Sequence, residues 1–277
     1  MKADFYRHAA RRYLHDRHSY WVGVYSALRN QGRREDDYHY SDDAKNTFPR
    51  YNVLAAIGVE LDRLDPDRLP SSDDVLEWLR VAGGAAESLF TGSHEPGSIE
   101  AEAEDDERRR FIAFVNTLPG AEALEAAPLP YRRTLAADEA RRWRESILEA
   151  WELDGPDFWE PLRTDVVRGR SVLALRAESF LRGNEPSGPA SVAISEALHA
   201  LGVSRIIELR EYGPEFERES STAEFLYTGA EGLFFSRDLE WLIFASHEGV
   251  TTLGGSNVEQ LRADWPELGN FVWDELN

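Results

Sequence analysis

The sequence predicts an α+β fold, in which a helical N-terminal part is followed by an antiparallel β-meander with flanking helices. Apolar residues recur at helical spacing through the first half of the chain, whereas short apolar runs separated by Gly or Asp fill residues 223–255. Every position of the run 241–245 (WLIFA) is apolar, which is typical of a strand covered on both faces. We therefore expect a sheet of about four to six strands, with 241–245 as its most buried segment.

Helical spacing accounts for most of the first half. An aromatic-rich stripe indicates a helix over 4–30, and Pro49 suits the first turn of the next helix. Ser71, followed by acidic residues, predicts the N-cap of a third helix. A fourth helix is expected over 99–117, with a solvated first half because acidic residues precede arginines there at i,i+4 spacing. A fifth pattern covers about 136–152.

Gly155-Pro156 marks the expected domain boundary, because every clear strand pattern follows it. The prediction is an α-helical domain over 1–155 and an α+β domain with an antiparallel sheet over 156–277. Residues 171–180 fit a strand and a helix equally well. The remaining predicted elements are a helix over 194–201, a strand over 203–212, the meander, a closing helix over 258–265 and a docked apolar tail at 271–273.

Composition narrows the class of protein. The chain has 277 residues, 42% hydrophobic residues, no cysteine and a net charge of −20. There is no apolar leader pattern, and no apolar run reaches the length of a membrane span. We expect a soluble bacterial protein of the cytoplasm that needs no cofactor. Such an acidic surface repels phosphate groups, so nucleic-acid binding is unfavourable.

The acidic charge is concentrated toward the C-terminus, where residues 205–277 hold five arginines and fifteen Asp and Glu. A basic protein partner would relieve the repulsion within such a surface, although acidity can also serve solubility alone. We expect docking on the acidic connection 211–224, where aromatic residues supply anchors. The predicted protein-binding residues are Tyr212, Glu215, Phe216, Glu217, Glu219 and Tyr227.

A second candidate site is a His/Asp cluster near the N-terminus. His15 and His18 are three residues apart on a predicted helix, and the following loop contains Asp36, Asp37 and His39. Side chains of these types ligate divalent metals, which makes a metal-dependent hydrolase or nuclease the alternative function. Histidines on the surface of a helix beside an acidic loop explain the same pattern.

Three other motifs are weaker. Ser246-His247-Glu248 contains the residue types of a triad, but neighbours on a strand point to opposite faces. The turn 254–257 (GGSN) leads into a helix, which favours an N-cap over an anion site. Tyrosines and arginines alternate in the first helix and the loop after it, where they either stack on bases or pack within the fold.

The segment 240–248 (EWLIFASHE), the turn after it, Gly254-Gly255 and the closing helix resemble the C-terminal part of small α+β immunity-type proteins of bacterial toxin systems. The resemblance covers roughly the last fifth of the chain, and it implies a protein that binds and blocks a partner toxin without catalysis. No functional residue is transferred by it. The leading functional hypothesis is therefore a non-catalytic protein-binding protein of the immunity or defence type.

Overall fold

The computed structural model describes residues 2–32, 40–88, 94–120, 127–153, 162, 167, 169–182 and 187–273. The chain forms two compact units, Met1–Leu129 and Pro130–Asn277. This boundary precedes the predicted one at 155/156, because helix α6 (Ala137–Trp151) contributes its buried side chains to a core shared with the sheet. The α+β class is confirmed.

The N-terminal unit is helical, as predicted. The helices are α1 (Lys2–Gly32), α2 (Asp42–Lys45), α3 (Phe48–Asp62), α4 (Ser72–Ala85) and α5 (Ile99–Thr117), followed by a short 3-10 turn at Leu118–Gly120. Their apolar faces meet in one core, to which Leu14, Ile57 and Leu79 belong. Gly83 allows α4 and α5 to approach closely, because a Cβ atom there would lie only 2.8 Å from the Phe111 ring.

Three serines mark helix starts in this unit. The side chains of Ser41, Ser71 and Ser98 each accept a hydrogen bond from a backbone N–H in the first turn of the helix that follows. Such caps satisfy donors that the helix itself leaves unpaired. The predicted N-cap at Ser71 is therefore confirmed.

Replacing Ser71 with alanine is expected to lower the free energy of unfolding of the N-terminal unit by about 1 kcal/mol, because the N–H of Asp74 loses its acceptor. Urea denaturation of the purified variant measures the change. Ser72→Ala is the matched control, since Ser72 lies inside the helix and does not form the cap. Equal stability of the two variants would contradict the assignment of the cap.

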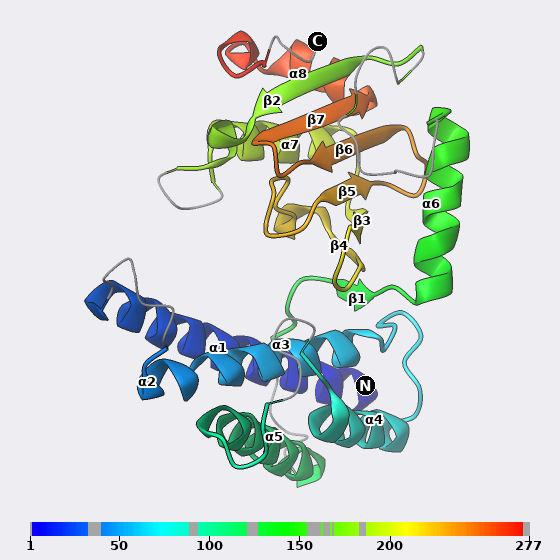
Figure 1. Cartoon of the computed structure of the whole chain (residues 1–277). Helices are drawn as coiled ribbons and strands as arrows, with labels where there is room; N and C mark the ends of the chain where they lie inside the picture. The colour runs from blue at the N-terminus through cyan, green and yellow to red at the C-terminus, as the bar shows by residue number, and fades with distance from the viewer. Residues whose placement is uncertain are drawn as a thin grey trace. The chain divides into compact units, whose positions relative to one another are not determined.

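The C-terminal unit is built around a seven-stranded sheet in the order β1-β4-β3-β5-β6-β7-β2 (Figure 1). Every neighbouring pair is antiparallel. The strands are β1 (Arg132–Thr134), β2 (Val172–Arg176), β3 (Arg205–Arg210), β4 (Phe216–Glu219), β5 (Gly232–Phe235), β6 (Trp241–Ala245) and β7 (Val250–Gly255).

The sheet has more strands than predicted, because three segments that were not assigned as strands form β1, β4 and β2. β1 lies in a proline-containing stretch, and β4 lies in the segment expected to be an acidic connection. The ambiguous residues 171–180 form β2 and a 3-10 turn. In contrast, residues 225–227 (FLY) are not a strand, although Phe225 is buried.

Helices cover both faces of the sheet. Helix α6 packs on one face, and α7 (Pro189–Ala200) with α8 (Ser256–Asp264) packs on the other (Figure 1). In β6, Trp241, Ile243 and Ala245 enter the core with α7 and α8, whereas Leu242 and Phe244 enter the core with α6. All five residues are buried, so the prediction of an apolar strand covered on both faces is confirmed.

The C-terminal tail adds to the edge of the sheet. The N–H of Arg176 donates to the carbonyl of Phe271 at 3.2 Å, and the N–H of Trp273 donates to the carbonyl of Ala174 at 2.9 Å. The predicted docking of the apolar tail is therefore observed on β2. Within the described part of the chain, every helix is too short or too polar to cross a membrane.

Candidate functional site

One end of the sheet gathers polar residues that are far apart in the sequence. The register aligns Arg210 of β3 with Gly232 of β5, and Gly232 with Ala245 of β6. Ala245 in turn pairs with Thr251 of β7. Residues that follow β3, precede β5 and follow β6 therefore come together at this end.

Glu231 is the buried centre of this end. Its side chain is 6% exposed, and its Oε1 atom accepts three hydrogen bonds from the turn after β6. The Ser246 hydroxyl donates at 3.1 Å, the backbone N–H of His247 at 3.3 Å and His247 Nδ1 at 2.6 Å. The His247 side chain itself is 65% exposed, so the buried carboxylate orients an imidazole that faces solvent.

Two tyrosines lie beside this histidine. Tyr212 follows β3 and is 49% exposed, and Tyr227 precedes β5 and is 39% exposed. The Tyr212 hydroxyl donates to the carbonyl of Gly229, and the rings of Tyr227 and His247 meet edge to face with centroids 6.3 Å apart. A hydrogen bond between the two tyrosine side chains raises the pKa of Tyr227.

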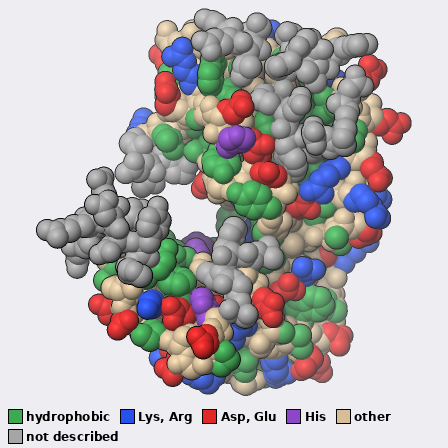
Figure 2. Space-filling view, viewed as in Figure 1, with side chains coloured by type: hydrophobic (Ala, Val, Ile, Leu, Met, Phe, Trp, Pro, Cys, Tyr) green, Lys and Arg blue, Asp and Glu red, His purple; other side chains and the backbone are tan. Residues whose placement is uncertain are grey.

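These side chains form the surface that we call the tyrosine–histidine face. It consists of Glu211, Tyr212, Tyr227, His247 and Glu248, all of them exposed. On its visible side, the C-terminal unit shows a histidine among acidic and hydrophobic side chains (Figure 2). Exposed aromatic rings beside carboxylates are suited to binding another protein, because aromatic residues contribute much of the binding energy once they are buried.

The arrangement does not form a nucleophile–base relay. Ser246 is buried, and its hydroxyl donates to Glu231 instead of to His247. Glu248, the acid of the sequence motif, donates its backbone N–H to the Ser246 hydroxyl at 3.1 Å. The carboxylate that binds the histidine is Glu231, which sequence reasoning missed. Its only local signal is a single acidic residue directly before the apolar strand 232–235.

Of the six predicted protein-binding residues, only Tyr212 and Tyr227 lie on this face. The other four lie on β4 or directly before it, and most of them already have partners within the unit. Glu217 is 1% exposed and binds the guanidinium groups of Arg133 and Arg237 at 2.7–2.9 Å. The expectation that Glu217 is an exposed contact residue is therefore wrong, because arginines from other elements enclose it.

The neighbours of Glu217 are also engaged. Glu215 pairs with Arg144 of α6, and burial raises the pKa of the Glu215 carboxyl. The Phe216 ring is buried beneath Arg132, whose guanidinium carbon lies 5.1 Å from the ring centroid. Glu219, which is half-buried, accepts from the backbone N–H of Tyr131 at 3.2 Å.

The N-terminal metal candidates are only partly described. His15 is exposed and lies 3.2 Å from Asp16, and His18 packs edge to face on Tyr51. Asp36, Asp37 and His39 lie outside the described residues. Among the residues that the structure describes, no three His, Asp or Glu side chains come together to hold a metal ion. The metal-dependent alternative stays a prediction.

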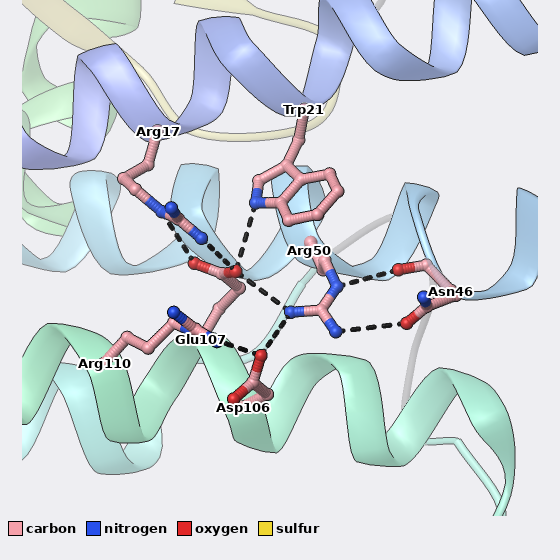
Figure 3. Close-up of polar contacts among 7 residues, drawn as sticks. All are labelled: Arg17, Trp21, Asn46, Arg50, Asp106, Glu107 and Arg110. Carbon is pink, nitrogen blue, oxygen red and sulfur yellow. Dashed lines mark hydrogen bonds and ion pairs between the residues drawn. The ribbon is translucent and has the colours of Figure 1, made fainter. Parts of the chain in front are cut away.

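The N-terminal unit contains a second polar cluster, shown in Figure 3. The Glu107 side chain, fully buried on α5, accepts from Arg17 and Trp21 of α1 and from Arg50 of α3, with distances of 2.5–3.1 Å. Asp106 binds Arg50 and Arg110, and the hydrogen bond from Arg50 lowers the pKa of Asp106. The first half of α5 is thus not fully solvated, contrary to the prediction.

This cluster joins three helices and leaves no carboxylate atom of Glu107 without a donor. Its arrangement is that of a structural ion cluster, because the buried charge is matched by arginines that hydrogen-bond to it. Two aromatic residues of α1 also pack within the unit, since Tyr13 stacks on Phe114 at 4.4 Å and Arg50 lies 4.9 Å from the Trp21 ring. Tyr20 of the same helix is 58% exposed.

Comparison with protein families, with curated proteins and with solved structures found no match to this chain. The interpretation of the site therefore rests on its geometry.

Proposed function

We propose that the chain is a non-catalytic protein of the bacterial cytoplasm, of the immunity or defence-associated type, that recognises a basic protein partner. The observation that carries the proposal is the tyrosine–histidine face. It places two exposed tyrosines and the exposed residues Glu211 and Glu248 at one end of the sheet, whose strand β6 is buried at every position.

The charge of the chain supports a basic partner. The net charge is −20, and the carboxylates of the tyrosine–histidine face are exposed, whereas Glu217 and Glu208 of the neighbouring strands are buried with arginines. Exposed carboxylates attract a basic protein over a distance and accelerate its association. Paired carboxylates contribute much less to that attraction.

Site-specific photocrosslinking tests the proposal. A benzophenone amino acid at Tyr227 is expected to crosslink one basic protein in native lysate, and the purified protein should then form a complex that weakens with added salt. The control places the same group at Val192 of α7, which is 50% exposed in the same unit. If position 227 yields no product that position 192 lacks, the proposed function fails.

A further inference from the structure

We propose that the tyrosine–histidine face binds an arginine side chain of the partner. This inference rests on the proposed function and specifies the chemistry of the contact. The face offers three kinds of group to solvent, namely aromatic rings, carboxylates and an imidazole nitrogen.

The imidazole of His247 presents an acceptor to solvent when it is neutral. Glu231 also receives hydrogen bonds from the Ser246 hydroxyl and the His247 backbone N–H, so it acts as a carboxylate acceptor toward the ring. His247 Nδ1, 2.6 Å from Glu231, must then carry the proton. The proton-free Nε2 of the neutral ring is left to accept from a ligand.

The remaining groups of the face complement the same ligand. Glu211 and Glu248 supply exposed carboxylates, and Tyr212 and Tyr227 supply half-exposed rings. A guanidinium group has five N–H donors, no acceptor and a flat surface that stacks on aromatic rings. The protein already uses this contact internally, because the guanidinium carbon of Arg205 lies 3.6 Å from the centroid of the Tyr131 ring.

The test is an NMR titration of the full chain with N-acetyl-arginine amide. Signals of Tyr212, Tyr227 and His247 are expected to shift together with a Kd in the millimolar range. N-acetyl-citrulline amide, which has the same shape without the charge, should bind about tenfold more weakly. Tyr227→Ala should weaken arginine binding about fivefold, whereas Tyr40→Ala, a change at an exposed tyrosine of the other unit, should leave it unchanged.

A further variant separates the role of His247. In His247→Gln the side chain keeps an amide oxygen that can accept from the guanidinium group, so arginine binding should be retained, whereas His247→Leu removes the acceptor and should weaken arginine binding. Equal shifts with citrulline and arginine, or shifts confined to other residues, would overturn the inference. If arginine fails while a partner still crosslinks at position 227, only this inference fails. If both experiments fail, the proposed function fails with it.

Discussion

Replacing Glu217 by lysine is expected to destabilise the C-terminal unit by about 3–5 kcal/mol, which is enough to unfold it in many proteins of this size. The carboxylate is 1% exposed and faces Arg133 and Arg237. A lysine would place a third positive charge in this site and would remove the carboxylate that binds both arginines. Arg133 would keep its second partner, Glu139, at 2.6 Å.

Urea denaturation combined with hydrogen-exchange mass spectrometry measures this effect and assigns it to a unit. Glu219→Lys is the matched control on the same strand, and its cost is expected to be below about 1 kcal/mol because Glu219 is half-exposed. A stable Glu217→Lys protein with native exchange in β4 would show that the carboxylate is not a buried ion-pair partner. If Glu217→Lys unfolds the unit as expected, this substitution cannot be used to test partner binding.

Glu107→Ala is expected to lower the free energy of unfolding of the N-terminal unit by about 3–5 kcal/mol. The substitution leaves the guanidinium of Arg17 and the indole N–H of Trp21 without the acceptor that they share, and it deprives Arg50 of one of its partners. It also opens a cavity among α1, α3 and α5. At neutral pH the variant should therefore unfold at a lower urea concentration than the unsubstituted protein. Protection against hydrogen exchange should be lost first in these three helices.

Asp106→Asn is the control for the N-terminal cluster. Asp106 binds Arg50 and Arg110, but its side chain is 28% exposed. Because water can solvate the groups that lose a partner, removing its charge should reduce the stability less. We expect a cost of about 1 kcal/mol or less. If Asp106→Asn and Glu107→Ala destabilise the unit equally, burial of Glu107 is not what makes the cluster stabilising.

Asp106 makes a contribution to the free energy of unfolding that depends on pH, because the hydrogen bond from Arg50 lowers the pKa of its carboxyl group. Because the folded pKa lies below the unfolded one, this contribution is present above the unfolded pKa of about 3.9 and is lost as the pH falls through the folded value. The contribution of Asp106 is therefore fully present across the neutral range.

Local patterns in the sequence were sufficient for most of the fold. The helix predicted over 99–117 agrees with α5 at both ends, and the apolar run 241–245 is the buried strand β6. Both results have the same physical reason. A helix or strand must turn its apolar side chains toward a core, so apolar residues recur at a fixed spacing along the sequence.

Burial of charge had no such local pattern. Glu107 and Glu217 resemble the exposed acids around them, yet each is enclosed by arginines that lie 20 to 90 residues away in the sequence. Glu231 meets His247 because β5 and β6 are paired in one register, which brings residues on either side of a hairpin to the same end of the sheet. These long-range contacts decide which carboxylates are buried and which are exposed. The sequence alone does not reveal them, because the pairing of two distant segments produces no periodic pattern in either segment.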